Sequence, residues 1–320
     1  MSSKVKVALI GAGGMANAVH YPSLAVFDDV DIVGLCDIVP DKLKATAENF
    51  RIKKTFSDYR KLIEDTAPDA VYVLMPPHHL FDIAVDVMTR KLHLFIEKPP
   101  GVYTEQTRQM ANCAEANGVI AMVGFNRRYI PLMRKCRDMV RDHGGPIIQA
   151  MSSFYKWHTG GAYYNGAIDI LSCDAVHAVD TLRWIGGDVT KLASDVSAQG
   201  MPFDTRFNAL AQFESGGAGV LLCNWRVGGR MHQFEMHAEG ISAYVNPNTH
   251  ADILVDGADK PKRITAIKAA GSNENRVYYG FEGENRAFID AVKTGQEPDS
   301  SMRDAVKTME LVDRIYHSAL

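Results

Sequence analysis

The sequence predicts an α/β protein of two domains, a doubly wound parallel sheet followed by an α+β domain with an open antiparallel sheet. Over the first 124 residues, short apolar strands alternate with helical segments, as expected for parallel β-α-β units. After about residue 125 this alternation ends, and a later stretch is mostly short strands. The length of 320 residues also exceeds what a single core usually supports. We therefore expect domains at 1–124 and 125–320.

The composition excludes several classes of protein. A hydrophobic content of 46% and a charged content of 23% are typical of a globular chain. A net charge of −3 gives no attraction to nucleic acid or to an anionic membrane, and no apolar run is long enough to span a bilayer. Five dispersed cysteines indicate free thiols in a reducing compartment, and the start leaves no room for a signal peptide. We expect a cytoplasmic protein.

A glycine motif follows the first expected strand, residues 5–10. Gly11, Gly13 and Ala16 form Gly-x-Gly-x-x-Ala between a strand and a helix, which is the context that a dinucleotide-binding turn requires. Gly11 can make the tight turn, Gly13 lets a pyrophosphate approach the backbone, and Ala16 allows close helix packing. The first-turn amides of that helix would face the phosphates, and they belong to Gly14, Met15 and Ala16. The alternative is a glycine-rich turn without a ligand.

The second expected strand, residues 32–36, ends in Asp37. An acidic residue at this position can accept hydrogen bonds from the adenosine ribose hydroxyls. Its carboxylate would repel a 2′-phosphate, so the sequence favours NAD over NADP. Lys42 and Lys44 nevertheless keep NADP open as a second cofactor.

The remaining elements of the first domain continue the alternation. Further strands are expected at 53–56, 70–75, 92–97 and 119–124. Helices are expected at 40–50, 58–65, 79–90 and 104–117.

The strand that begins at Leu92 ends in Glu97-Lys98-Pro99, an ionisable pair followed at once by a proline. Ligands bind at the carboxyl ends of strands in such sheets, and the proline keeps Lys98 extended. The plainer interpretation is a lysine in a surface ion pair. Three other residues leave strand ends toward the same edge and are interpreted as cofactor contacts together with Glu97 and Lys98: Pro76, His79 and Asn126.

No metal site is expected in this chain. His78 and His79 are adjacent and therefore do not share a helical face, and no cysteine or carboxylate lies at ligand spacing from them. We interpret both His78 and His79 as part of the wall of a cofactor pocket.

The second domain begins with an amphipathic helix and is then mostly strands. Helices are expected at 131–143, 167–186, 281–293 and 301–318. The clearest strands are 147–155, 207–213, 218–225, 233–237 and 251–255, with a loop of aromatic and small residues at 156–166.

The helix expected at 167–186 carries Asp174, His177 and Asp180 at steps of three, which places them along one stripe. An imidazole flanked by carboxylates is a plausible general base. The alternative is a buried histidine with satisfied hydrogen bonds and solvated acids.

Together these features resemble the glucose–fructose oxidoreductase / inositol dehydrogenase family over nearly the whole chain. The resemblance rests on the glycine motif, Asp37, Glu97-Lys98-Pro99 and three further segments, which are 124–128, 177–184 and 288–295. It implies a Rossmann domain followed by a domain with a large open antiparallel sheet that often makes oligomer contacts. We therefore expect a homo-oligomer, a dimer or tetramer, assembled through the C-terminal sheet.

The resemblance has one departure. The family commonly has an aspartate four residues before the helix histidine, whereas this chain has Cys173 there and Asp174 one residue later. Positions three and four before His177 both lie near its face of the helix, so Asp174 can take the role at a different angle. Otherwise the proton relay lacks a carboxylate.

The resemblance implies an NAD(P)-dependent enzyme that transfers hydride between a nicotinamide and a secondary hydroxyl or ketone of a sugar, sugar derivative or cyclic polyol. His177 would take the hydroxyl proton, and Lys98 would stabilise the developing alkoxide. Both would therefore contact substrate, as would Arg128, Trp157, Tyr163, Tyr164 and Asn165. Packing at a subunit interface is the alternative for the loop aromatics. Two other functions are a cofactor-sensing regulator and an oxidoreductase for a non-sugar cyclic diol.

Overall fold

The computed structural model describes residues 4–318, which divide into two compact units. The first unit comprises the chain up to Phe125 together with Phe281–Val306, and the second comprises Asn126–Gly280 and the chain from Lys307 onward. This division differs from the expected domains 1–124 and 125–320, because Phe281–Val306 lies with the first unit. The Phe288 ring packs against Tyr72 and Phe95 at centroid distances of 5.3 and 5.6 Å, which holds the segment there.

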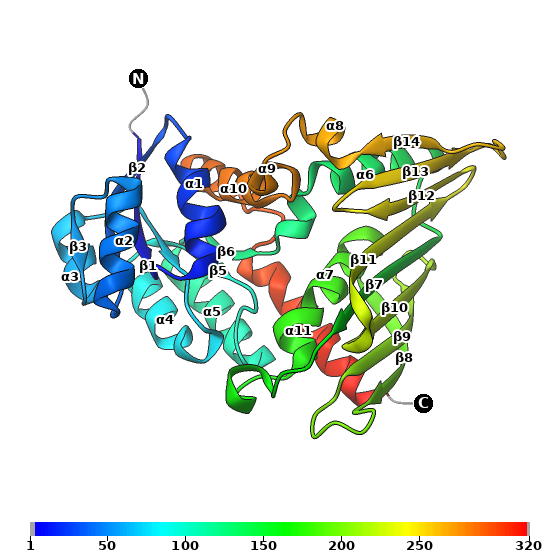
Figure 1. Ribbon diagram of the computed structural model, residues 1–320, viewed down its shortest axis with the longest axis horizontal. Coiled ribbons are helices and arrows are strands. Elements are labelled where there is room, and N and C mark those ends of the chain that lie inside the picture. The colour runs from blue at the N-terminus through cyan, green and yellow to red at the C-terminus, as the bar shows by residue number, and fades with distance from the viewer. Residues whose placement is uncertain (1–3, 319–320) are drawn as a thin grey trace. The chain divides into compact units, whose positions relative to one another are not determined.

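The first unit contains a six-stranded sheet in the order β3-β2-β1-β4-β5-β6, and all its pairs are parallel (Figure 1). Its strands are β1 (Val5–Ile10), β2 (Val30–Cys36), β3 (Thr55–Phe56), β4 (Ala70–Val73), β5 (His93–Glu97) and β6 (Ala121–Gly124). β4 and β6 are buried at every residue, as expected for strands covered on both faces. The predicted parallel sheet is confirmed.

Helices follow the strands of the first unit in the predicted alternation. They are α1 (Tyr21–Ala25), α2 (Pro40–Phe50), α3 (Tyr59–Thr66), α4 (Phe81–Thr89), α5 (Thr104–Asn117) and α10 (Phe281–Thr294), with a π-helical turn η1 (Ala16–His20) and a 3-10 turn η2 (Pro77–His79). The Asp58 side chain caps α3 by accepting a hydrogen bond from the amide of Arg60, and Gly118 ends α5 in the left-handed conformation. α4 begins two residues later than predicted because η2 precedes it.

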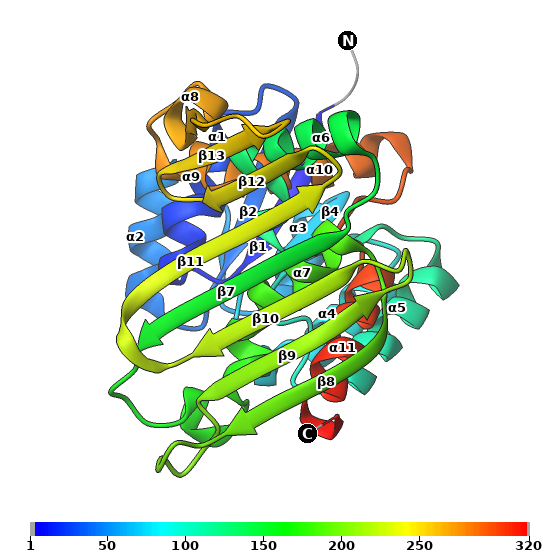
Figure 2. The same ribbon diagram turned by 90° about the vertical axis from the view of Figure 1, so that its right-hand side faces the viewer.

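The second unit contains an eight-stranded sheet in the order β14-β13-β12-β11-β7-β10-β9-β8, which Figure 2 shows face-on. Its strands are β7 (Gln149–Trp157), β8 (Val189–Ser197), β9 (Arg206–Phe213), β10 (Ala218–Asn224), β11 (Arg226–Ala238), β12 (Ile241–Asn246), β13 (His250–Val255) and β14 (Lys262–Thr265). Neighbouring strands are antiparallel except for β7 and β10, which run parallel. The sheet is therefore mixed rather than purely antiparallel, because the chain leaves β7 through a helix and two strands before β10.

The helices of this unit include α7 (Val176–Gly186), which packs on β7 and β10. The others are α6 (Pro131–Gly144), α8 (Ala266–Ala270), α9 (Asn275–Tyr278) and, from Lys307 on, α11 (Met302–His317), with the short turns η3 (Asn126–Tyr129), η4 (Tyr163–Gly166) and η5 (Leu171–Ala175).

The helix predicted at 167–186 starts later than expected and is interrupted. The carboxylate of Asp169 accepts a hydrogen bond from the amide of Ser172 at 2.9 Å, so residues 167–169 cap the helix instead of joining it. Its first part, Leu171–Ala175, is a π-helical turn, a feature that is frequent at functional sites.

Two further properties follow from the described residues. Over 4–318, no helix is both long enough and apolar enough to cross a membrane. All five cysteines are free thiols, and four of them are buried.

We predict that Phe288→Ala destabilises the protein by about 3–5 kcal/mol, because it removes a fully buried ring from between two aromatic neighbours. Urea unfolding measures this free energy. Tyr103→Ala is the control, since its side chain is 69% exposed and its loss should change stability by at most about 0.5 kcal/mol. Equal unfolding midpoints for the two variants would show that α10 is not part of the core.

Candidate active site

The turn after β1 can only be made with glycine at its first position. Gly11 has φ +115°, and a Cβ there would lie 2.1 Å from the carbonyl oxygen of Leu74. The carbonyl of Gly11 also accepts a hydrogen bond from the Tyr21 hydroxyl at 3.0 Å. At Gly13 and Gly14 an added Cβ would meet no atom of the described chain within 4 Å. The outer side of the turn is therefore an open cradle next to a helix start, which fits a pyrophosphate.

A cavity of about 630 Å³ lies beside this turn, entirely within the first unit. The predicted cofactor contacts that line it are Gly11, Gly13, Asp37, Pro76 and His79. Of the others, Ala16 is buried and Met15 is half exposed at the helix start. Asn126 belongs to the second unit, where its side-chain amide donates to the carbonyl oxygen of Tyr279 at 2.9 Å.

Asp37 is held at this cavity by two backbone amides. Its Oδ2 accepts a hydrogen bond from the amide of Ala12 at 2.7 Å, and its Oδ1 accepts one from the amide of Val39 at 2.8 Å. The carboxylate is thus fixed beside the glycine turn, where a ribose would be bound. Lys42 and Arg60 also line the cavity, whereas Lys44 forms a solvent-exposed pair with Glu48. Arg60 was not foreseen, although it directly follows the capped start of α3.

Lys98 follows β5 and is half buried, and its peptide bond to Pro99 is cis. The carboxylate of Glu97 accepts a hydrogen bond from the backbone amide of Lys98 at 3.1 Å. Its other oxygen binds the ring of His20 at 2.8 Å. Lys98 therefore lies on a segment that is held from inside the first unit.

In the second unit, Asp174 is the centre of a compact polar group. Its Oδ2 accepts a hydrogen bond from the Tyr163 hydroxyl at 3.0 Å and forms an ion pair with Lys156. The Tyr163 oxygen in turn accepts from the Trp225 indole at 3.1 Å. Burial, and then the negative charge of Asp174, raise the pKa of Tyr163, so this phenol remains protonated and donates.

Lys156 is a residue that the sequence did not single out. β7 extends to Trp157, two residues beyond its predicted end, and this places Lys156 on the strand instead of in the loop. Its ammonium lies 4.9 Å from the centre of the Phe154 ring. The two-residue alternation of a strand, which puts Phe154 and Lys156 on one face, is the only local signal for it.

Within the predicted stripe of Asp174, His177 and Asp180, the two aspartates have different partners. His177 is 6% exposed on the first turn of α7. Asp180 is 1% exposed, and the Arg128 guanidinium binds it through two hydrogen bonds of 2.9 and 2.5 Å. Thr308 donates a third hydrogen bond to Asp180 at 2.9 Å. Asp180 is therefore half of a buried ion pair.

This ion pair also corrects the expectation for Arg128. Its guanidinium is 3% exposed and is committed to Asp180, so Arg128 joins the 3-10 turn η3 to α7 within the second unit. We do not retain it as a substrate contact.

Trp157, the last residue of β7, and the loop residues Tyr164 and Asn165 have exposed side chains in the second unit. Trp157 is 56% exposed, with the Arg226 guanidinium 4.9 Å above its ring. Tyr164 is 46% exposed, and both Tyr164 and Asn165 have left-handed backbones with φ of 49° and 57°. Such a conformation is unfavourable for a tyrosine and is typical of residues held in place by function or by neighbours.

The first unit is thus a dinucleotide-binding half, and the second carries buried acid–base groups on a mixed sheet, a combination found in nucleotide-dependent oxidoreductases. Residues 5–125 match the family described as "Oxidoreductase family, NAD-binding Rossmann fold", and residues 140–243 match the "GFO/IDH/MocA C-terminal domain". The chain belongs to this Gfo/Idh/MocA oxidoreductase family, which confirms the resemblance seen in its motifs and the assignment as an NAD-dependent enzyme.

Similar proteins extend over almost the full chain. A myo-inositol 2-dehydrogenase of Thermotoga maritima is 25% identical over 317 residues, which are 94% of this chain and 92% of that protein. Among solved structures, a dehydrogenase from Chromobacterium violaceum has a TM-score of 0.90 at 18% identity, covering 99% and 96% of the two chains. A levoglucosan dehydrogenase in complex with NADH has a TM-score of 0.83 at 19% identity, covering 99% and 97%.

We predict that Gly11→Ala weakens NADH binding at least about tenfold, since the new methyl group must displace the Leu74 carbonyl and deform the cradle. Fluorescence titration measures the affinity. Gly118→Ala is the matched control, because Gly118 also has a positive φ but caps α5 with open space around it. An unchanged Kd in Gly11→Ala would contradict the assignment of the cradle.

Proposed function

We propose that this protein is an NAD-dependent dehydrogenase acting on a secondary hydroxyl, or in reverse on a ketone, of a sugar, sugar derivative or cyclic polyol. The observation that carries the proposal is the open glycine cradle with Asp37 fixed beside it by two backbone amides. Membership of the oxidoreductase family supports hydride transfer as the reaction. Relatives named for myo-inositol and D-apiose support the substrate class.

The proposed chemistry divides between two residues. In the oxidative direction His177 accepts the proton of the substrate hydroxyl, while the hydrogen on the same carbon leaves as hydride. Lys98 donates a hydrogen bond to that oxygen and stabilises the negative charge that develops on it. NAD⁺, when bound at the glycine cradle, would supply the hydride acceptor. The products are a ketone, NADH and a protonated imidazole.

Asp174 has a positioning role in this proposal. The ammonium of Lys156 and the hydroxyl of Tyr163 both bind its carboxylate, which keeps it ionised near the start of α7. An ionised carboxylate favours the protonated form of a neighbouring imidazole. In this proposal Asp174 replaces the aspartate that the family commonly has at the position of Cys173, one residue earlier. The π-helical turn at Leu171–Ala175 alters the number of residues per turn here, and so the direction in which Asp174 points relative to His177.

The substrate contacts proposed for the second unit are those at its loop. Aromatic faces suit the apolar faces of a sugar ring, and hydroxyl and amide groups suit its hydroxyls. The candidates are Trp157, Tyr163, Tyr164 and Asn165. For the cofactor, the Asp37 carboxylate disfavours a 2′-phosphate, whereas Lys42 and Arg60 at the same cavity are the groups that would accommodate one.

The direct test is NADH formation, measured at its absorbance band, from NAD⁺ with myo-inositol, D-glucose and levoglucosan. With a substrate found in this panel, Lys98→Met should lower kcat by about 10²–10³-fold, as expected for removing one preorganised donor to a developing oxyanion. Its affinity for NADH should remain. Lys44→Met, an exposed lysine outside the cavity, is the control. An unchanged kcat in Lys98→Met would contradict the proposed role of Lys98 as the donor to the substrate oxygen.

We also propose that copies of the chain associate through the outer face of the eight-stranded sheet. No helix of residues 126–280 or 307–318 covers this face in Figure 2. A shallow pocket there runs along β8 and β9, and Leu210 at its edge is 60% exposed. Exposed apolar surface of this kind is typical of contact sites.

For this association we predict that the parent protein is larger than a monomer by light scattering. Leu210→Glu should shift it toward the monomer, because a charge would then be buried in the contact. A monomeric parent protein at micromolar concentration would contradict the proposal.

A further inference from the structure

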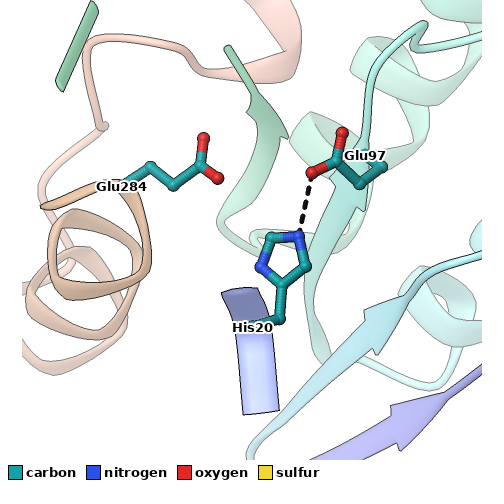
Figure 3. A group of neighbouring side chains, drawn as sticks. All are labelled: His20, Glu97 and Glu284. Atoms are coloured by element: carbon teal, nitrogen blue, oxygen red, sulfur yellow. Dashed lines mark hydrogen bonds and ion pairs between the residues drawn. The ribbon is translucent and has the colours of Figure 1, made fainter. Parts of the chain in front are cut away.

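His20 is a fully buried histidine next to the catalytic segment of the first unit. It ends the π-helical turn η1, has no exposed surface, and packs edge-on against Phe95 at 5.3 Å. Its Nε2 lies 2.8 Å from Oε1 of Glu97. Figure 3 marks this interaction with a dashed line. The other oxygen of Glu97 accepts the backbone amide of Lys98 at 3.1 Å. One carboxylate thus joins a buried ring to the backbone of Lys98.

Asn285 contacts the other nitrogen of His20. The Asn285 amide nitrogen donates to the carbonyl oxygen of Phe281 at 2.7 Å. Nδ1 of His20 lies 3.1 Å from that nitrogen and 3.3 Å from Oδ1 of Asn285, so it faces the end of the Asn285 side chain. A carboxylate oxygen accepts, so Nε2 is the donor in the contact with Glu97. The series from Phe281 through Asn285, His20 and Glu97 to Lys98 is thus continuous.

Glu284 is a further buried group beside this series. Figure 3 shows its side chain extending from α10 toward Glu97 and His20. Potential ligand atoms of the three side chains lie within 4.8 Å of one another, and Glu284 has no exposed surface. Both ring nitrogens of His20 already take part in hydrogen bonds. These hydrogen bonds account for the positions of His20 and Glu97, and Glu284 lies beside them.

We propose that His20, oriented by Asn285, is a positioning residue for the dehydrogenase reaction, and that it sets the place of Lys98 by holding the carboxylate of Glu97. This inference rests on the function proposed above. It also gives a reason for the position of α10, since Asn285 comes from the C-terminal segment that folds with the first unit.

The physical basis is that a catalytic group must be held to a fraction of an ångström. The bond from His20 to Glu97 is shielded from water, which strengthens it relative to a surface contact. Without it, the partly buried carboxylate of Glu97 loses the donor on one of its oxygens, and a shift of this carboxylate displaces the Lys98 backbone that is bound to the other. A displacement of about 1 Å at a reacting group can lower the rate about 10²-fold.

The experiment compares His20→Phe, which keeps a ring but has no nitrogen, with His20→Gln, whose amide offers Glu97 a donor and Asn285 an acceptor. We expect about 10²-fold lower kcat in His20→Phe, with the Kd for NADH unchanged, and partial recovery in His20→Gln. Ser23→Ala is the matched control, because it removes another buried hydrogen bond from the same region, that of Ser23 to the carbonyl oxygen of Val19. It should lower Tm and leave kcat unchanged.

A second measurement does not require a substrate. Hydrogen exchange of the Lys98 backbone amide, followed by NMR, should be faster in His20→Phe and unchanged in Ser23→Ala. If the parent protein turns over no sugar or polyol, the proposed function fails, while this exchange still tests the positioning of Lys98. Unchanged exchange in His20→Phe, or parental kcat in that variant, would overturn the inference. Loss of parental activity on treatment with EDTA would also overturn it, in favour of a metal at these side chains.

Discussion

The close approach of the Gly11 turn to the carbonyl of Leu74 is the constraint on which the cofactor half of the molecule depends. No side chain fits where the backbone of β1 passes the end of β4, so the chain turns there with a left-handed glycine. That turn presents the backbone of Gly13 to the cavity, and the space around Gly13 and Gly14 is open. The amide of Ala12, in the same turn, also holds Asp37 in place. The proposed phosphate and ribose contacts thus depend on the same turn.

Buried charges in this protein serve two different purposes. The pair of Arg128 and Asp180 is almost completely enclosed and joins elements of the second unit, so its role is structural. Asp174 is 15% exposed, and its partners Lys156 and Tyr163 are a lysine and a phenol at the same border between core and surface. Asp174 and Asp180 each lie three residues from His177 and could not be told apart from the sequence. Their different burial distinguishes them in the structure.

Much of the first unit follows from local sequence. Pro40 at the start of α2 and Gly118 after the end of α5 are local signals, and the predicted bounds of both helices match the structure to the residue. The Gly-x-Gly-x-x-Ala motif predicted a dinucleotide-binding turn, and a cavity lies beside that turn. These signals lie within a few residues of the structure they determine.

What sequence could not predict depends on contacts between distant segments. The partner of Arg128 is 52 residues away, and Asn285 meets His20 across 265 residues. Lys156 was missed because β7 continues two residues beyond its apolar pattern, supported by pairing with β11. The π-helical turn at Leu171–Ala175 could not be predicted, because the spacing of apolar residues there is equally consistent with a regular α-helix.

The most direct test of the central claim is a fluorescence titration of nucleotide-free protein with NADH and, separately, with NADPH. The claim is that the first unit binds NAD with Asp37 on its ribose. It predicts saturable binding of NADH and markedly weaker binding of NADPH, because the 2′-phosphate meets a carboxylate that two backbone amides hold in place. Equal or tighter binding of NADPH would contradict this and would indicate that Lys42 and Arg60 bind the 2′-phosphate. Binding of neither would contradict the cofactor site, and with it the dehydrogenase.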